Sequence, residues 1–332
     1  MGVAPVRFGV LSTAKINLQV LAGARASDRV DVVAVASREG ERAEAYAREH
    51  GIERAHGSYE ALLEDPGVEA IYISLPNSLH IEWSIRALEA GKHVLCEKPL
   101  DRRPAEVERA FDAAERADRF LAEAFMYRHN PQMLRLAELV REGAIGELRL
   151  VRAAFSFSLT ELANVRMQPE LDGGALLDVG CYCVSGCRLV AGEPERVVGE
   201  SVAASTGVDV RFAAVMRFAG DVVAHFDCGF DLPPRDELEV VGSDGSLFLD
   251  DPWHARSPVI ELRRGDETER IELRRADSYR LELENLGDAI RGEVAPLLGR
   301  EDALGQARAL DALQRSAAEG RPVTPERGPR SP

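Results

Sequence analysis

The chain has 332 residues, of which 45% are hydrophobic and 29% are charged, as is typical of a globular protein with more than one core. Its formal net charge of -15 disfavours a nucleic-acid-binding surface or a surface for anionic membranes. No run of consecutive apolar residues approaches the roughly 18 that span a bilayer, and the first residues lack the basic and apolar regions of a secretory signal. These features predict a cytoplasmic protein that binds neither nucleic acid nor membrane.

The five cysteines predict neither disulfides nor a metal site. An odd, unevenly spaced set in a chain without an export signal is not typical of a disulfide framework. Cys181, Cys183 and Cys187 are close in sequence, but on a helix only the last two would share a face. That arrangement does not supply the tetrahedral ligands of a zinc site. We expect buried, free cysteines and no metal.

Short apolar runs alternate with amphipathic stretches over about the first 122 residues. Alternating strands and helices of these lengths predict a parallel sheet with right-handed crossovers, which is the Rossmann type of α/β domain. We expect strands over residues 6–11, 30–36, 68–74, 92–96 and 120–124, and helices over residues 14–26, 39–50, 78–90 and 104–117.

From about Phe125 the pattern changes to strands joined by turn signals such as Ala219-Gly220-Asp221. This predicts an α+β domain with a large, mostly antiparallel sheet and helices on one face. We expect strands over residues 148–159, 209–218, 222–230, 237–242, 246–250, 259–264 and 269–274, and helices over residues 131–141, 175–191, 278–291 and 300–319. The predicted domains are residues 1–123 and 124–324, followed by a loose tail over residues 325–332.

Polar residues follow four predicted strands of the first domain. In open parallel sheets, ligands bind beyond the carboxyl ends of the strands, so these residues predict one shared ligand site. Pro99 restricts the preceding Lys98 to extended backbone, which aims the lysine in one direction. The four segments are Ser12-Thr13-Ala14, Ser37-Arg38, Leu75-Pro76-Asn77 and Glu97-Lys98.

The turn after the first strand is a degenerate form of the dinucleotide fingerprint G-x-G-x-x-G. Ser12, Ala14 and Asn17 occupy its three glycine positions. Small residues still permit a tight turn, and the backbone amides from Thr13 to Ile16 are placed to face a pyrophosphate at a helix N-terminus. Lys15 either adds positive charge there or is an ordinary solvated side chain.

The end of the second strand favours NADP over NAD. An NAD enzyme has an acidic residue there for the ribose hydroxyls, whereas an NADP enzyme needs cations for the 2′-phosphate. This chain has Ser37 and Arg38, with Arg42 one helical turn later, and no carboxylate before Glu39. The alternative is that both arginines are surface residues, but the helix dipole disfavours a cation in the first turn.

Five segments resemble the glucose-fructose oxidoreductase, inositol dehydrogenase and rhizopine catabolism family (Gfo/Idh/MocA). The resemblance implies a nucleotide-binding domain and a C-terminal mixed sheet that is often used for oligomerisation. It also implies NAD(P)-dependent oxidation or reduction of sugars and polyols, and a cis peptide bond between Lys98 and Pro99. The segments that carry it are residues 8–16, 74–80, 97–99, 124–128 and 172–182.

Two departures from the family pattern stand out. Ser12 and Ala14 replace the family's usual glycines, which affects the pyrophosphate contacts. Tyr182 stands where some members have a histidine, and this choice resembles the subgroup of dihydrodiol dehydrogenases, xylose dehydrogenases and glucose-fructose oxidoreductase. The stretch from Asn164 to Leu171 also resembles that subgroup.

Asp178 and Tyr182 are four residues apart on the predicted helix and therefore share a face. Oxidation of a secondary alcohol needs a base, and a free tyrosine with a pKa of about 10 is a poor one. A lysine cation about 4 Å away would favour the tyrosinate by roughly 4 kcal/mol. Our hypothesis is that Tyr182 is the acid/base, that Lys98 tunes it, and that Asp178 orients substrate hydroxyls or Lys98. The alternative is a purely structural Asp–Tyr pair.

Other residues receive supporting assignments. We expect Glu97 to hold the nicotinamide ribose or backbone, and Leu75, Pro76, Asn77 and His80 to lie beside the cofactor. A helix-surface position is the alternative for His80. The candidates for a substrate rim, each with a structural role as the alternative, are Tyr127, Arg128, Asn164 and Arg166.

Three functions are compatible with these residues. The first is an NADP-dependent dehydrogenase of a sugar or polyol, acting on a pyranose such as xylose or glucose or on a trans-dihydrodiol, as a homodimer or homotetramer formed through the C-terminal sheet. The second is a ketoreductase of nucleotide-linked deoxysugars. The third is an NADP-sensing regulator without turnover, which Lys98, Asp178 and Tyr182 disfavour because a sensor needs no base.

Overall fold

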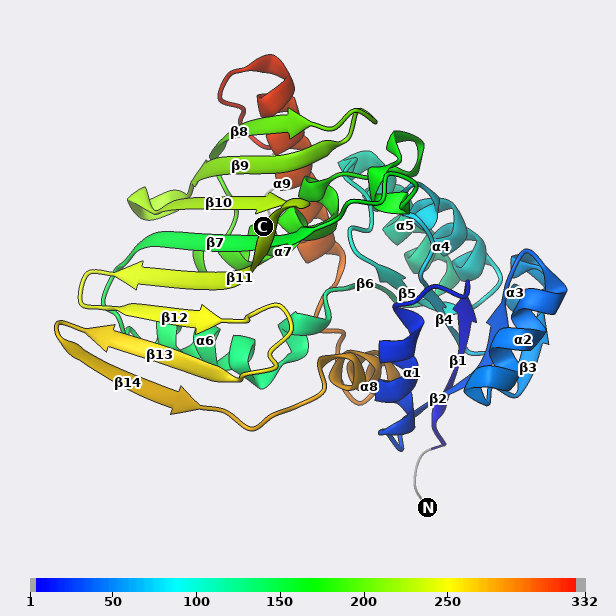
Figure 1. The fold of residues 1–332 in the computed structure, drawn as a ribbon. Coiled ribbons are helices and arrows are strands. Elements are labelled where there is room, and N and C mark those ends of the chain that lie inside the picture. Colours follow the sequence, from blue (N-terminus) through cyan, green and yellow to red (C-terminus); the bar gives the residue numbers. More distant parts are fainter. Residues whose placement is uncertain (1–3, 327–332) are drawn as a thin grey trace. The chain divides into compact units, whose positions relative to one another are not determined.

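The computed structural model describes residues 4–326 and divides into two compact units (Figure 1). The first unit comprises the chain up to Asp101, Ala105–Met126 and Asp277–Leu304. The second comprises Arg102–Pro104, Tyr127–Ala276 and the chain from Gly305 onward. Part of the predicted tail, residues 327–332, lies outside the described residues.

A parallel sheet forms the centre of the first unit, as predicted, but with six strands where the sequence predicted five (Figure 1). Its middle strands are buried and rich in Val, Ile and Leu, as expected for strands covered on both faces. The strand order reverses between β1 and β4, and such a switch point is where doubly wound sheets bind nucleotides. In spatial order the strands are β3 (Arg54–His56), β2 (Val30–Ala36), β1 (Val6–Leu11), β4 (Ala70–Ile73), β5 (His93–Glu97) and β6 (Leu121–Ala124).

The predicted helices of this unit are present with small shifts at their ends. The sequence reasoning missed two short elements, β3 and α3, because three to five residues are too few to show a period. The helices are α1 (Asn17–Arg25), α2 (Gly40–His50), α3 (Tyr59–Leu63), α4 (His80–Glu89) and α5 (Pro104–Ala117).

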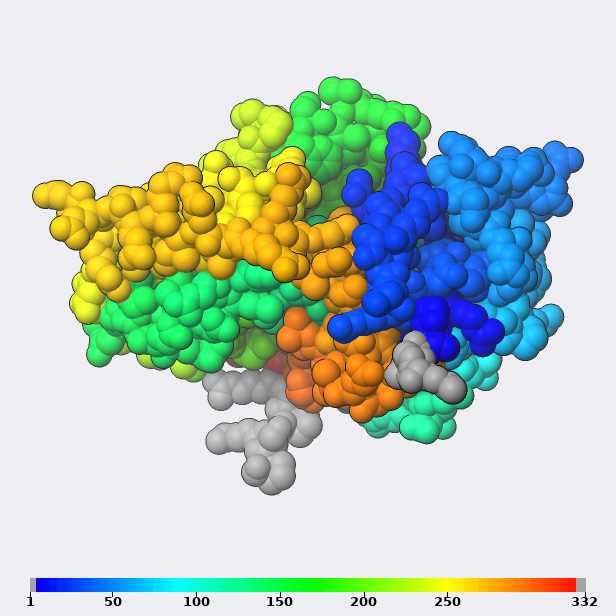
Figure 2. All heavy atoms as spheres, turned by 90° about the horizontal axis from the view of Figure 1, so that it is seen from below, coloured from blue at the N-terminus to red at the C-terminus, as the bar shows by residue number. Residues whose placement is uncertain are grey.

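The helix α8 (Ser278–Ile290) belongs to the first unit, whereas the sequence placed the whole of residues 124–324 in the second domain. It packs closely on α1, and a Cβ atom at Gly23 would stand 2.7 Å from the amide nitrogen of Arg280. In Figure 2 the orange atoms of α8 lie against the blue atoms of α1. A helical period shows that α8 is amphipathic but not which core it covers.

The second unit contains an eight-stranded sheet in which only the β7–β10 pair is parallel. Helices α6 (Pro131–Arg141), α7 (Cys181–Ala191) and α9 (Arg300–Glu319) lie on one of its faces (Figure 1). The sequence reasoning missed β8. In spatial order the strands are β14 (Glu267–Glu272), β13 (Val259–Arg264), β12 (Ser246–Asp250), β11 (Asp231–Gly242), β7 (Leu148–Ser158), β10 (Val223–Gly229), β9 (Asp209–Arg217) and β8 (Arg196–Ala203).

The predicted helix over residues 175–191 is not a uniform α-helix. A π-helical turn, Leu176–Gly180, precedes α7 and contains Asp178. The segment Pro169–Ala191 is long and apolar enough to cross a bilayer by length and composition alone. However, 78% of its most apolar window is buried inside the protein, as in the core helix of a globular domain.

Candidate active site

The turn after β1 contains a serine in a backbone conformation that usually requires glycine. Ser12 has φ 100°, and its hydroxyl lies 2.9 Å from the hydroxyl of Ser74 at the end of β4. The same oxygen accepts a hydrogen bond from the amide of Ala14 at 3.2 Å. These bonds hold the tight turn and partly offset the steric cost of a positive φ. They explain how a degenerate glycine fingerprint still forms this turn.

The turn leads directly into α1, so that the residues predicted to face a pyrophosphate are contiguous. The side-chain amide of Asn17 donates to the carbonyl of Ser12 at 2.9 Å, which ties the helix start to the strand end. Lys15 is exposed at this turn. The predicted segment of Thr13, Ala14, Lys15 and Ile16 therefore lies between the end of β1 and the first residue of α1.

Two arginines and a threonine gather beside this turn. The Nε of Arg42 donates to Oγ1 of Thr13 at 2.8 Å. Burial raises the pKa of Tyr59, and the positive charges of Arg38 and Arg42 both oppose that shift, so both act on one ring. Ser37 is buried at the adjacent end of β2. Two guanidinium groups and hydroxyls in one place are a donor set that fits a phosphate monoester. This observation shows that the residues fit NADP.

Carboxyl groups make hydrogen bonds at the end of β5 and just after it. The hydroxyl of Tyr72 donates to Glu97, the last residue of the strand, and burial and the charge of Glu97 raise the pKa of Tyr72 well above its usual range. The Lys98–Pro99 peptide bond is cis, as the family resemblance implied. The next amide, that of Leu100, donates to Oε1 of Glu123 at 2.8 Å.

His80 lies in the core and not on a helix surface, which makes that alternative wrong. Its ring is 0% exposed at the start of α4. Nδ1 lies 2.8 Å from the carbonyl oxygen of Pro99, and Nε2 lies 2.8 Å from that of Leu75. Both ring nitrogens are therefore occupied by backbone carbonyls. Asn77 begins the short 3₁₀ turn, Asn77–Leu79, that leads into α4.

In the second unit, Arg166 and Asp178 form an ion pair, with Nε donating to Oδ2 at 2.7 Å. Asn164 accepts a hydrogen bond from the amide of Arg166 and so begins a 3₁₀ turn there. The carbonyl of Arg166 accepts from the amide of Gly174 at 2.9 Å. A Cβ at Gly173 would overlap that carbonyl. The glycine is thus what lets the segment of Arg166 approach the start of the π turn.

Asp209, which the sequence reasoning missed, caps the helix that carries Asp178 and Tyr182. Its Oδ2 accepts a hydrogen bond from the amide of Leu176 at 2.7 Å. Burial raises the pKa of Asp209 to about 6, although hydrogen bonds from backbone amides oppose the shift. Nothing in the sequence near Asp209 indicates this role, because the capped amide lies 33 residues earlier in the chain.

Tyr182 packs in a cluster of aromatic rings and is 7% exposed. Its ring centroid lies 5.6 Å from that of Tyr127, 5.4 Å from that of Phe155 and 6.0 Å from that of Trp253. Tyr127 is 0% exposed, and its hydroxyl donates to Ser185 at 2.8 Å. The prediction that Tyr127 lies at a substrate rim is therefore wrong, because its ring belongs to this cluster.

The loop that supplies Trp253 is fixed by carboxylates. The amide of Trp253 donates to Oδ1 of Asp236 at 3.1 Å, and Nδ1 of His254 lies 2.6 Å from Oδ2 of the same carboxylate. Asp236, Asp251 and His254 are the group with metal-type donors that the described residues contain. Arg256 already pairs with Asp251, with Nη2 at 2.8 Å from Oδ1, so this charge is compensated without a metal.

The candidate residues are divided between the units, with Lys98 in the first and Asp178 and Tyr182 in the second. Arg128 donates to Ser185 at 3.2 Å and therefore lies at the same helix as Tyr182. A parallel sheet with Arg42 and Thr13 at its carboxyl edge, in one chain with a second unit that contains Asp178 and Tyr182, is the arrangement of a dinucleotide-dependent oxidoreductase.

Comparison with known proteins gives the family. The model of the oxidoreductase family with an NAD-binding Rossmann fold matches residues 6–125, and the model of the GFO/IDH/MocA C-terminal domain matches residues 133–248. The chain belongs to the GFO/IDH/MocA oxidoreductase family.

Several relatives match nearly the whole chain. A D-xylose 1-dehydrogenase (NADP(+)) from Haloferax volcanii is 39% identical over 95% of this chain and 98% of its own. A trans-1,2-dihydrobenzene-1,2-diol dehydrogenase from Danio rerio is 35% identical over 80% of this chain and 79% of its own. The crystal structure of a 3-ketoreductase from Actinomadura kijaniata with NADP and TDP-benzene is 33% identical, has a TM-score of 0.88, and covers 94% of this chain and 98% of its own. Variants of that reductase with a tyrosine changed to phenylalanine or a lysine to alanine match at TM-scores of 0.89 and 0.82.

Proposed function

We propose that the protein is an NADP-dependent dehydrogenase that oxidises the C1 hydroxyl of a free aldopyranose of the xylose type. Its class, an oxidoreductase of sugar-type substrates that uses NADP, follows from the family and its relatives. The free sugar is favoured because the xylose dehydrogenase has the higher identity, 39% against 34% for a reductase of a dTDP-linked sugar, at equal coverage of this chain.

The first unit holds the cofactor. The amides from Thr13 to Ile16 face the pyrophosphate, and Ser37, Arg38 and Arg42 bind the 2′-phosphate. Leu75, Pro76, Asn77 and Glu97 border the nicotinamide end. When bound, NADP supplies the nicotinamide ring that accepts or donates the hydride.

Tyr182 removes the proton of the substrate hydroxyl and returns it in the reductive direction. The residue is buried, so its hydroxyl needs a charged neighbour to become a base at neutral pH. Lys98 supplies that charge. The lysine and the tyrosine replaced in the ketoreductase variants are as far apart in that chain as Lys98 and Tyr182 are in this one, which supports the pair.

Asp178 orients the sugar by accepting hydrogen bonds from its hydroxyl groups. The ion pair with Arg166, with Nε 2.7 Å from Oδ2, fixes the position of this carboxylate. Arg166, Asn164 and Arg128 contribute to the rim of the same site.

The change Tyr182→Phe tests the assignment. We expect turnover with xylose and NADP to fall by about 100-fold or more, because general acid–base catalysis contributes that much, while the Kd of NADP stays within about twofold. Retained turnover in the folded variant would refute the role of Tyr182.

The second candidate is reduction of a nucleotide-linked deoxyketosugar. The structural match to a 3-ketoreductase that holds NADP and TDP-benzene favours it. Binding of TDP and of xylose, each measured by calorimetry with NADP present, separates the two functions. A protein that binds TDP but does not bind xylose would be the ketoreductase.

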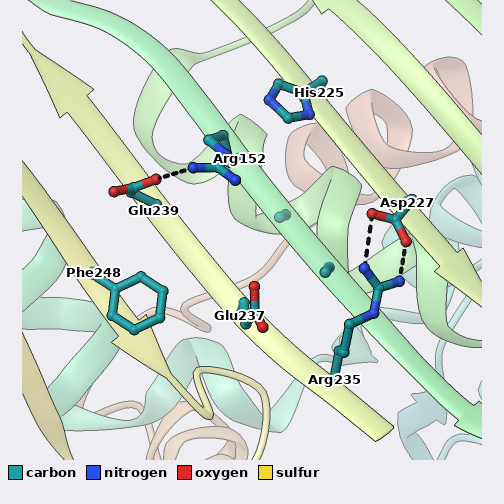
Figure 3. Close-up of a pocket in the computed structure, with 9 residues that line it drawn as sticks. Arg152, His225, Asp227, Arg235, Glu237, Glu239 and Phe248 are labelled. Atoms are coloured by element: carbon teal, nitrogen blue, oxygen red, sulfur yellow. Dashed lines mark hydrogen bonds and ion pairs between the residues drawn. The ribbon is translucent and has the colours of Figure 1, made fainter. Parts of the chain in front are cut away.

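We also propose that the enzyme is a homodimer or homotetramer, formed through the sheet face opposite α6, α7 and α9. Figure 3 shows a hollow on this sheet whose lining includes the ion pairs Arg152–Glu239 and Arg235–Asp227, with His225 and Phe248 beside them. Charges of both signs on one face allow the same patch to pair with itself. Five free cysteines support the cytoplasm as the compartment.

A further inference from the structure

The side chain of His80 connects the chain segments that follow β4 and β5, beyond the last paired residues of these two strands. Strands β4 and β5 pair only as far as Ile73 and Cys96. The segments that follow contain Leu75 and Pro99. The two 2.8 Å contacts of the buried His80 ring, to the carbonyls of Leu75 and Pro99, continue the connection past the sheet.

The carbonyl of Pro99 is next to the functional lysine. Proline has no N–H, so the turn from Lys98 to Leu100 offers few groups by which it can be held. The Leu100 amide is held by Glu123 at 2.8 Å, and the Pro99 carbonyl by His80. Loss of the His80 contact would leave the side of the turn nearest Lys98 without this anchor.

The charge state of the ring sets how many hydrogen bonds the connection contains. A neutral imidazole has one N–H and donates to one carbonyl, whereas the doubly protonated ring donates to both. Burial and the neighbouring charge of Lys98 lower the pKa of His80, and Asp101 and the two carbonyls oppose this shift. The ring also fills a fully buried space, so it holds the two segments apart at a fixed separation in either form.

We propose that His80 is a positioning residue that fixes the direction of Lys98 by tying the Pro99 carbonyl to the end of β4. Its ring nitrogens face these two carbonyls, and its predicted place beside the cofactor stays a prediction. The inference rests on the proposed role of Lys98 in the reaction.

The test compares His80→Phe and His80→Gln with His93→Phe as the matched control. His93 lies at the opposite end of β5 and contacts the amide of Phe120 through Nδ1. For His80→Phe we expect kcat to fall by about 10- to 100-fold, because small misplacements of a functional group have effects of this size. We expect the pH profile of kcat to move to higher pH, while the Kd of NADP changes by less than about threefold. The control should retain kcat and its profile.

A readout besides activity is the acylation rate of Lys98 by a small amine reagent, followed by peptide mass spectrometry with NADP present. A released lysine should react at a changed rate in His80→Phe and not in His93→Phe. If His80→Phe does not fold, His80→Gln carries the same test, because its flexible side chain does not hold the two carbonyls at a fixed separation. An unchanged profile of kcat and unchanged labelling in a folded His80 variant would overturn the inference.

The double variant Lys98→Ala/His80→Phe separates failure of this inference from failure of the proposed function. If His80 acts through Lys98, the second change should lower kcat by less than about twofold once Lys98 is absent. Full additivity of the two losses would overturn the inference. Normal turnover of Lys98→Ala alone would instead refute the role of the lysine on which the inference rests.

Discussion

Nε of Arg166 donates to Oδ2 of Asp178 at 2.7 Å, although the two residues lie in separate turns that flank a glycine pair. The carboxylate is 15% exposed and the guanidinium 43%, so the pair stands at the border between core and solvent. The ion pair therefore fixes the position of the Asp178 carboxylate. We propose that the carboxylate held in this way is the anchor for the hydroxyl groups of the sugar.

The change Arg166→Ala tests this anchor. Removal of the guanidinium leaves a half-buried carboxylate without its charged partner, so we expect kcat/KM for the sugar to fall about tenfold, mainly through KM. Steady-state kinetics at saturating NADP measure this effect. Arg211→Ala is the control, because its ion pair with Asp231 is exposed on both sides. If the two variants have the same kcat/KM for the sugar, Arg166 does not position Asp178 for substrate binding.

A second prediction concerns cofactor choice. In Arg42→Ala, one cation is lost from the predicted 2′-phosphate site, so the Kd of NADP should rise about tenfold while that of NAD changes little. Fluorescence titration with both reduced cofactors gives the ratio. Arg48→Ala is the matched control on the same helix, because Arg48 pairs with Glu44 at an exposed position. A parallel loss of NAD affinity would show that Arg42 acts on the fold of the turn.

The positive φ of Ser12 gives a third prediction. Ser12→Gly should alter the free energy of unfolding by no more than about 1 kcal/mol, because relief of strain offsets the lost hydroxyl bonds. Ser12→Val should destabilise the protein by about 1–3 kcal/mol and weaken NADP binding, because a branched side chain is strained at this φ. Thermal unfolding with and without NADP tests both. If the valine variant is as stable as the glycine variant, the backbone at position 12 is not strained by a branched side chain.

Asp209 gives a prediction for the pH dependence of stability. Its pKa in the folded protein, about 6, is above the ordinary 3.8, so the folded state binds more protons than the unfolded state between these values. This group therefore adds stability as the pH falls through 6, by up to about 3 kcal/mol near pH 4. Relative to Asp209→Asn, the wild type should gain stability between pH 8 and pH 4 in urea unfolding. If the free energy of unfolding changes with pH in the same way in both proteins, the raised pKa of Asp209 is refuted.

The sequence allowed the local features of the molecule to be predicted and left the long-range ones open. The parallel sheet, the turn at Ser12 and the helix of Asp178 follow from apolar periods and from residues adjacent in the chain. The position of α8 on the first unit does not, because its apolar face fits either core. The π turn before α7 could not be predicted from the sequence either, because one extra residue in a helical turn does not interrupt the run of apolar residues.

The same division holds within the site. Thr13 was predicted at the end of the first strand and Arg42 one helical turn after the end of the second, and parallel topology is what brings such segments together. Asp209 and Trp253 were missed because they act on the helix of Tyr182 from distant strands and loops. Tyr127 was misplaced since a tyrosine near a motif looks the same in sequence whether its ring is at a rim or in a core. Only packing distinguishes these cases.

The most direct test of the central claim, that Lys98 makes Tyr182 a base, is a titration of Tyr182 itself. Trp83 and Trp253 are the two tryptophans of the chain, so the change Trp83→Phe leaves Trp253, 6.0 Å from Tyr182, as the only tryptophan. A tyrosinate absorbs where tryptophan emits and quenches it. With NADP bound, we predict a quenching step near neutral pH that disappears in Tyr182→Phe and moves to clearly higher pH in Lys98→Ala. A step at the same pH with and without the lysine would contradict the account.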